Sequence, residues 1–150
     1  MPREILIPDY WLAVRTQLGD DDVVARFRTY MPTESAKRRF PVMMIIRWPY
    51  TEKKDGMPRK PELQRMSDFE DILERKIEKP VVGIQAACVT GAGRRTWRYY
   101  VADPEAYLRA LGPILKNHAP STTTVRRVDD PEWSGLSELI PLGQCANIEA

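Results

Sequence analysis

Hydrophobic and polar residues alternate with the two-residue period of a β-strand through the first part of the chain. The alternation predicts two strands, Trp11–Leu18 and Val23–Met31, joined by a short acidic turn that begins at Gly19. The next apolar run, Phe40–Trp48, is apolar at both alternating positions through most of its length. This pattern is typical of a strand in the middle of a sheet.

Proline and charge interrupt the pattern after this run, and residues 49–61 are predicted to form a loop with its tightest turn at Asp55-Gly56. A helical period then begins at Ser67, where Glu70 three residues later completes a capping box. The apolar residues that share one helical face are Phe69, Ile72, Leu73 and Ile77. We therefore expect an amphipathic helix that begins at Ser67 and lies on the sheet.

Strand and helix signals alternate over the rest of the chain. The predicted strands are Pro80–Val89, Arg95–Ala102 and Thr122–Val128. Asp103 and Pro104 begin a second helix, since aspartate is a good N-cap and proline is favoured at the first helical position. Gly112-Pro113 is expected to bend or break that helix. Asp130-Pro131 begins a short last helix in the same way, with Trp133 facing inward.

The order of these elements from Phe40 onward is strand, helix, strand, strand, helix, strand. This order predicts an α+β fold, a ferredoxin-like sandwich (βαββαβ), with an extra N-terminal β-hairpin and a short C-terminal helix. With 150 residues and 43% hydrophobic content, we expect a single domain over residues 1–150. Residues 1–9 and 142–150 are expected to be loosely ordered.

Charge and cysteine content narrow the classes of function. The chain has 23 basic and 21 acidic residues, so its net charge of +2 gives no global field and an electrostatic partner must meet a local patch. The N-terminus does not resemble a signal peptide, and no apolar run approaches the roughly 20 residues of a spanning helix. We therefore expect a cytoplasmic protein with no membrane association. Cys88 and Cys145 are expected to be reduced thiols.

Four segments of the chain resemble one known family. They are "DYW", "KKDGMP", "FEDILERKIEKPVVGIQAACVTGAGRRTWRYYVADPE" and "DDPEWSGLSELIP". The family is the bacterial family of unknown function numbered 695 (DUF695), and the resemblance runs from about Tyr10 to Pro141. The resemblance implies a ferredoxin-like fold similar to the ribonuclease E activity regulator B type, whose members bind a protein. It implies no catalytic residues.

The stretch from Gly91 to Thr96 is similar to the start of a dinucleotide fingerprint, but the third glycine is missing and a strand follows, so we predict no phosphate site. The RNA-recognition fold is also a ferredoxin-like sandwich that stacks bases on strand aromatics. Its glycine-aromatic pattern is absent here, and only Trp48 qualifies as a partner aromatic on the first strand of the sandwich. One histidine, His118, is too few for a catalytic triad or a metal cluster.

Acidic groups are explained by local structure. Asp20, Asp21 and Asp22 fit a hairpin turn better than a cation site, and Asp130 fits a helix cap. Carboxylates that are distant in sequence can still meet in space, so a hydrolase remains an alternative. We expect no cofactor and no metal.

Arginine and tyrosine are predicted to gather on one exposed face of the sheet. Trp97, Tyr99 and Val101 are expected to pack as core, which leaves Arg98 and Tyr100 on the opposite face. Arginine and tyrosine are over-represented at protein-binding hot spots. The predicted partner-binding residues are Arg26, Arg28, Tyr30, Arg47, Arg95, Arg98, Tyr100 and Arg126. The alternative interpretation is a solvated face with scattered ion pairs.

These observations favour a non-enzymatic protein-binding module. We expect a regulator or immunity-type inhibitor, a monomer or homodimer, that occludes a partner protein such as a toxin or nuclease. It would act through the predicted face, the charged loop over residues 51–61, or both. The alternatives are single-stranded nucleic-acid binding by the same face, and a hydrolase that uses dispersed carboxylates.

Overall fold

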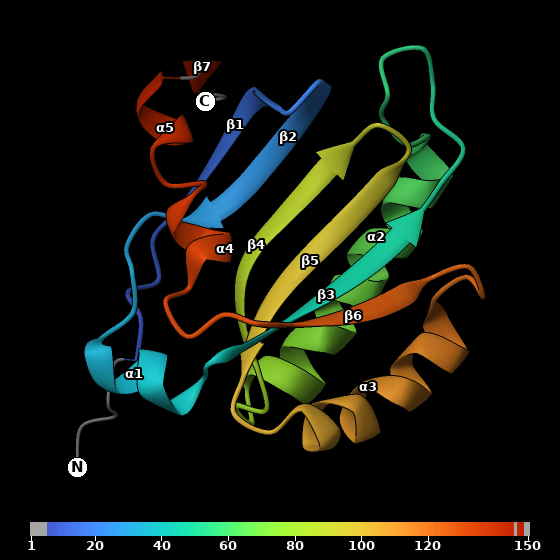
Figure 1. Ribbon diagram of the computed structural model, residues 1–150. Helices are drawn as coiled ribbons and strands as arrows, with labels where there is room; N and C mark the ends of the chain where they lie inside the picture. The colour runs from blue at the N-terminus through green and yellow to red at the C-terminus, as the bar shows by residue number, and fades with distance from the viewer. Residues whose placement is uncertain (1–5, 146, 149–150) are drawn as a thin grey trace.

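One antiparallel sheet organises the protein in the computed structural model, which describes residues 6–145 and 147–148. The described residues form seven strands that lie in the order β6-β3-β5-β4-β2-β1-β7 (Figure 1). The strands are β1 Trp11–Leu18, β2 Asp21–Arg28, β3 Val42–Pro49, β4 Ile84–Gly91, β5 Arg94–Val101, β6 Thr124–Asp129 and β7 Asn147–Ile148. The β1–β2 hairpin thus extends the sheet beyond β4, and β7 pairs with β1.

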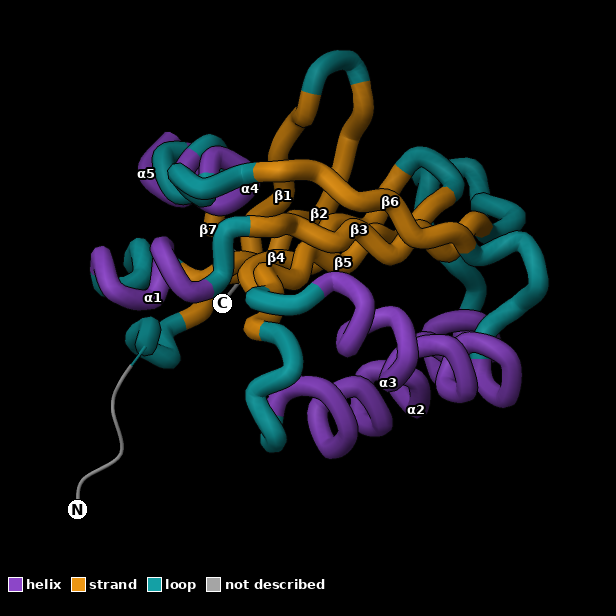
Figure 2. The backbone as a smooth tube through the Cα atoms, turned by 60° about the horizontal axis from the view of Figure 1, so that its bottom comes forward, coloured by secondary structure: helices purple, strands orange, loops and turns teal. Residues whose placement is uncertain are grey.

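Helices cover both faces of this sheet. They are α1 Glu34–Arg39, α2 Lys60–Leu73 with its π-helical continuation η1 Glu74–Glu78, α3 Pro104–His118, α4 Ser134–Ser137 and α5 Leu142–Cys145. Figure 2 shows α2 and α3 together on one side of the sheet, and α4 and α5 on the other. The predicted α+β class is therefore confirmed.

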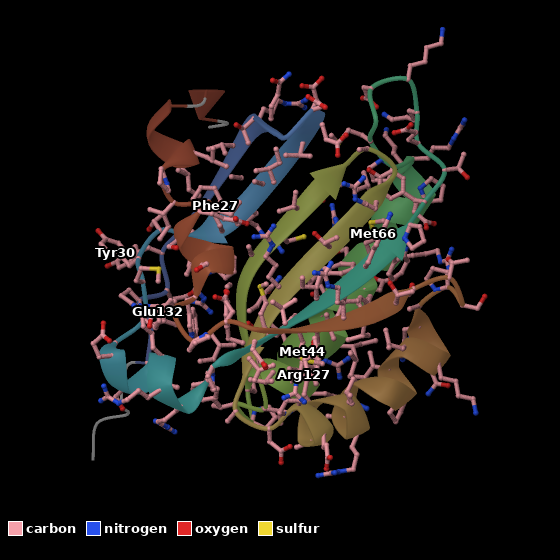
Figure 3. All side chains as sticks on the ribbon, viewed as in Figure 1. Phe27, Tyr30, Met44, Met66, Arg127 and Glu132 are labelled. Carbon is pink, nitrogen blue, oxygen red and sulfur yellow. The ribbon has the colours of Figure 1, made fainter. Side chains whose placement is uncertain are left out.

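Each face of the sheet has its own hydrophobic core, because alternate residues of a strand point to opposite faces. Met44, on β3, faces α2 and α3 and packs with Met66 and others in what we call the first core. Met43, its neighbour, faces the other way and packs with Phe27 and Trp133 in the second core. Figure 3 labels Met44 and Met66 in the first core and Phe27 in the second.

The first long helix begins earlier than the capping-box pattern predicts. α2 starts at Lys60 after Arg59, with Pro61 in its first turn, where a missing N–H costs nothing. The prediction of a helix start at Ser67 is wrong, because Ser67 lies inside the helix. Glu70 therefore has no capping role, and its carboxylate accepts hydrogen bonds from residues of β5.

The second long helix is continuous from Pro104 to His118. Asp103 caps it by accepting from the N–H groups of Glu105 and Ala106, as the sequence predicts. Gly112-Pro113 does not interrupt the helix, although a bend or break was expected there. Both residues are exposed, and Leu111 and Ile114 on either side of them pack in the first core.

The last predicted helix is shorter than its cap signal suggests. Trp133 adopts a left-handed conformation with φ of 57°, and α4 begins only at Ser134. Asp130 nevertheless caps it, since its two carboxylate oxygens accept from the N–H groups of Ser134 and Gly135 at 2.9 Å each. Within the tail that was expected to be loosely ordered, Leu142–Cys145 is helical as α5. Residues 1–5, 146 and 149–150 of the expected loose ends lie outside the described residues.

Candidate functional site

Four arginines meet on the sheet face opposite α2 and α3. Arg47 on β3 lies opposite Thr96 on β5 and Thr124 on β6. One step along the strands, Ile45 lies between Arg98 on β5 and Arg126 on β6. Arg94 lies at the start of β5 on the same face as Arg98. These residues line a shallow cavity of about 380 Å³, which we call the arginine hollow.

The hollow is open because α4 covers only part of this face. Gly135 of α4 lies against Met43 on β3 and Tyr100 on β5, and both strands continue past these residues to Arg47 and Thr96. The apolar floor of the hollow includes Ile45 and Val89. The loop after β3 lies next to the far end of the hollow, where Gly56 approaches the β4–β5 turn at Ala92. Figure 1 shows this loop projecting beside that turn.

Two of the four arginines are held by acids and two are not. Arg98 Nη1 donates to Glu138 Oε1 and to the Gly135 carbonyl, at 2.6 Å each. Arg94 Nη2 donates to Asp21 Oδ2 at 3.0 Å. Arg47 and Arg126 are exposed and have no ion pair among the described residues. In the hollow, ion pairs therefore hold the guanidinium groups of Arg94 and Arg98, while no described acidic group balances the charges of Arg47 and Arg126.

Tyr100 does not belong to this exposed surface, which corrects the prediction. Its ring is buried and stacks on Trp133 with centroids 3.9 Å apart and planes 6° apart. Its hydroxyl donates to Asp130 Oδ2 at 2.6 Å. Burial, and then the bond to Asp130, raise the pKa of Tyr100. The face assignment was right, but α4 folds back over it.

Arg95 points to the other face of the sheet, so the prediction that it looks away from the first core is wrong. Strand alternation places it on the same side as Trp97. Arg95 Nη1 and Trp97 Nε1 both donate to Glu70 Oε1, at 3.2 Å and 2.9 Å. Arg95 Nε also donates to Thr90 Oγ1 at 2.7 Å. This arginine holds α2 on the sheet.

Arg26 and Arg28 also face the α2 side, away from the arginine hollow. They lie over the ring of Trp11, with Arg28 Cζ at 4.7 Å from the ring centroid. Arg28 is 9% exposed and its Nε donates to the Gln85 carbonyl at 2.7 Å. Burial lowers the pKa of Arg28, and the charges of Glu78 and Asp9 oppose that effect.

Tyr30 lies outside both arginine groups. It is 56% exposed just beyond the end of β2, and its ring meets that of Tyr10 edge to face at 5.7 Å. Figure 3 shows Tyr30 far from Arg127 of β6. Of the eight predicted residues, only Arg47, Arg98 and Arg126 therefore lie in the arginine hollow.

A second cavity, which we call the N-terminal groove, lies on the α2 side of β1 and β2. It has a volume of about 1100 Å³, with Trp11, Arg26 and Arg28 on its floor. Its acidic wall comprises Glu70, Asp71, Glu74 and Glu78. Burial raises the pKa of Glu78, while the Gln85 N–H and Arg28 favour its ionised form. Glu70 and Glu78 therefore have structural partners that account for their positions.

Sequence reasoning missed Arg94, although a signal for it existed. Arg94 and Arg98 are four positions apart on one strand, so their side chains share a face. Among the described residues, no group of three or more histidine, cysteine, aspartate or glutamate side chains is arranged to hold a metal ion. The described part of the chain also contains no helix with the length and apolar character needed to span a membrane.

The fold and site define an α+β protein with a basic hollow on a partly covered antiparallel sheet. The chain belongs to DUF695, a family of unknown function whose model matches residues 9–139. This match confirms the family resemblance that the sequence motifs indicate. Comparison with curated proteins and with solved structures gave no match.

Proposed function

We propose that this chain is a non-enzymatic protein-binding module, a regulator or immunity-type inhibitor that occludes an acidic surface of a partner protein. The observation that supports the proposal is the pair of exposed arginines, Arg47 and Arg126, without ion-pair partners among the described residues. A guanidinium group binds carboxylates in a planar, two-bond geometry. An acidic partner such as a toxin or nuclease surface would neutralise both.

The remaining two arginines of the hollow support the same interpretation. Arg94 and Arg98 are held by Asp21 and Glu138, so a partner finds them already ordered. A side chain that is ordered before binding loses less conformational entropy when the complex forms. The apolar floor at Ile45 and Val89 adds surface that a partner can bury.

The arrangement of strands supports a finer classification of the fold. Elements β3-α2-β4-β5-α3-β6 follow one another, and their strands lie in the order β6-β3-β5-β4. We propose that these six elements are a ferredoxin-like unit of the ribonuclease E activity regulator B type, to which the β1–β2 hairpin is added. In this proposal the protein acts in the cytoplasm.

Single-stranded nucleic-acid binding has less support than protein binding. Such binding combines a positive groove with aromatic rings on which bases stack. The described lining of the arginine hollow contains no aromatic side chain, because Tyr100 is beneath Trp133. A phosphate backbone would meet arginines there without a stacking surface for the bases.

Affinity capture from a lysate of the source cells tests the proposal. The immobilised wild-type chain is expected to retain one protein in stoichiometric amount at low salt and to release it as salt rises. The double variant Arg47→Glu/Arg126→Glu should retain less than a tenth as much, because both carboxylate-binding groups are reversed.

The matched control is Arg38→Glu/Arg75→Glu, which makes the same charge change at two exposed helical positions. It should retain the partner like the wild type, and equal losses in both double variants would show a nonspecific charge effect. Recovery of nucleic acid in place of protein would contradict the proposal.

A further inference from the structure

The outer edge of the sheet beside the arginine hollow has no neighbouring strand among the described residues. β6 is the terminal strand of the sheet and pairs on its inner side with β3. Immediately after β6, the Asp130 N–H donates to the Pro41 carbonyl at 2.8 Å. Because hydrogen bonding alternates along an antiparallel ladder, the backbone N–H and C=O groups of Val125, Arg127 and Asp129 point away from β3.

Nothing in the described part of the chain covers this edge. Four of the six β6 residues are exposed, and the other two are half-buried. No described hydrogen bond uses the outward-facing N–H groups. In Figure 1, β6 is the outermost strand beyond β3. An unpaired edge of this kind is a template for a strand from another chain.

The charges along the edge are mainly positive on both faces of the sheet. Arg126 faces the hollow, and Arg47 lies one strand further in, opposite the short side chain of Thr124. Strands are about 4.8 Å apart, so an arginine can reach over Thr124 toward the edge. On the other face, Arg127 has only a 3.7 Å ion pair with Asp129, and both side chains are more than half exposed. Exposed pairs of this kind contribute little.

A second copy of this chain is a poor occupant of the edge. Consider β6 paired with β6 of an antiparallel second copy through the outward-facing N–H and C=O groups. Two alignments of the two strands give the greatest overlap. They place Arg126 opposite Arg126 or Arg127 opposite Arg127. Like charges directly opposite each other destabilise a strand pair. The charge distribution instead favours a strand that has acidic side chains.

We propose that an acidic segment of the partner adds to β6 as a further strand of the sheet. Main-chain hydrogen bonds to Val125, Arg127 and Asp129 provide affinity, and alternate side chains provide specificity. Acidic residues on the hollow side meet Arg126 and Arg47, and those on the other side meet Arg127. The inference rests on the proposed function and specifies how the partner is held.

A short labelled peptide, acetyl-Thr-Glu-Val-Glu-Val-Glu-Thr-amide, is the probe for the test. Binding of the probe to the wild-type chain is measured by fluorescence anisotropy, with a peptide that has glutamine in place of glutamate as the control. The Arg127→Pro variant removes an outward-facing N–H without breaking a bond to β3, and prolines are tolerated on edge strands. Arg127→Pro should bind the probe about tenfold more weakly than Arg127→Ala, which loses the same charge.

Two further measurements leave the protein unchanged. Amide hydrogen exchange of Arg127 and Val125 in the wild-type chain should slow when the probe binds, while that of Arg126 should change little. A probe that is methylated at those alternate backbone nitrogens whose N–H groups would face β6 should lose binding, because these nitrogens can no longer donate. These results do not depend on whether Arg127→Pro folds.

The outcomes separate the two proposals. Equal binding by Arg127→Pro and Arg127→Ala, with unchanged exchange at Arg127, would overturn strand addition. If Arg47→Glu/Arg126→Glu still lost the probe in that case, acidic recognition by the hollow would stand. If the double variant bound the probe like the wild type, or if the wild type did not bind it, strand addition of an acidic segment would be wrong. Normal partner capture by the double variant in the lysate experiment would separately overturn the proposed function.

Discussion

Asp130 joins the end of β6, the buried ring of Tyr100 and the start of α4. Its carboxylate accepts from the Tyr100 hydroxyl and from the N–H groups of Ser134 and Gly135. Burial by itself raises the pKa of Asp130, but these hydrogen bonds outweigh it and the net effect lowers the pKa. At the residue scale, the ionised carboxylate is therefore one of the groups that hold α4 over the second core, together with Arg98, which donates to Gly135 and Glu138.

The variant Asp130→Asn tests this role. A group with a lowered folded-state pKa contributes stability above its ordinary pKa of about 3.9, and the contribution is lost as the pH falls through the folded value. We expect the variant to lower the free energy of unfolding by about 1–3 kcal/mol at pH 7. Urea titrations should show the difference from the wild type shrinking below about pH 4. A difference that is constant with pH would contradict the assignment.

Two glycines show how position within an element decides the effect of one methyl group. Gly112 lies in the exposed face of α3, and a Cβ added there meets nothing within 4 Å. Gly135 lies in α4, where an added Cβ meets Met43 Sδ and lies 2.8 Å from the Tyr100 hydroxyl. The element that surrounds each glycine, and not the residue type, determines the outcome.

Gly112→Ala is expected to raise the free energy of unfolding by about 1 kcal/mol, because alanine loses less backbone entropy in a helix. Gly135→Ala is the matched comparison and should lower the free energy of unfolding, since Met43, the Tyr100 ring or α4 must shift to make room for the methyl group. Thermal unfolding followed by circular dichroism measures both. Destabilisation by Gly112→Ala would contradict the placement of Gly112 in an exposed, continuous turn of α3.

At the scale of the whole molecule, one sheet separates two cores and connects them. Consecutive residues of β3, Met43 and Met44, belong to different cores, so neither core can lose its packing without disturbing the same strand. The hollow and the β6 edge lie where this sheet extends past α4. The rigidity of the proposed binding surface therefore depends on both cores.

Trp133→Ala tests whether the two cores unfold together. Removing this fully buried ring from the second core is expected to lower the free energy of unfolding by about 3–5 kcal/mol. Because the strands are shared, unfolding of the variant should remain one transition. Far-ultraviolet circular dichroism and the fluorescence of the three remaining tryptophans, of which Trp48 and Trp97 lie in the first core, should give coincident curves. Separate transitions would show that the second core unfolds independently.

Local signals predicted much of the secondary structure. The strand alternation around Trp97 was sufficient to assign the faces of Arg98 and Tyr100, and the Asp103-Pro104 start of α3 is confirmed. The start of α2 was missed because its N-terminus has no side-chain cap, and a stronger capping pattern lies inside the helix at Ser67. A capping pattern indicates only a local preference. The longer helix from Lys60 forms because residues before Ser67, such as Met66, also pack in the first core.

The candidate site was predicted only in part for a similar reason. Parity along a strand is a local property, so Arg47, Arg98 and Arg126 were assigned to exposed positions from the sequence. The face that each strand presents, and what covers it, depend on contacts between distant segments. Arg95 is bound to Glu70 under α2, and Arg26 and Arg28 lie beside the N-terminal groove, because of such contacts.

The amino-acid sequence by itself determined the α+β class, the family, most strands and the alternation of faces, because these depend on period, capping and turn chemistry over short distances. Only the tertiary structure decided which face α4 covers, which arginines lack an acidic partner among the described residues, and that no described strand pairs with the outer edge of β6. The physical reason is that burial and charge compensation arise from residues far apart in the chain: Trp133 covers Tyr100, and Glu138 pairs with Arg98.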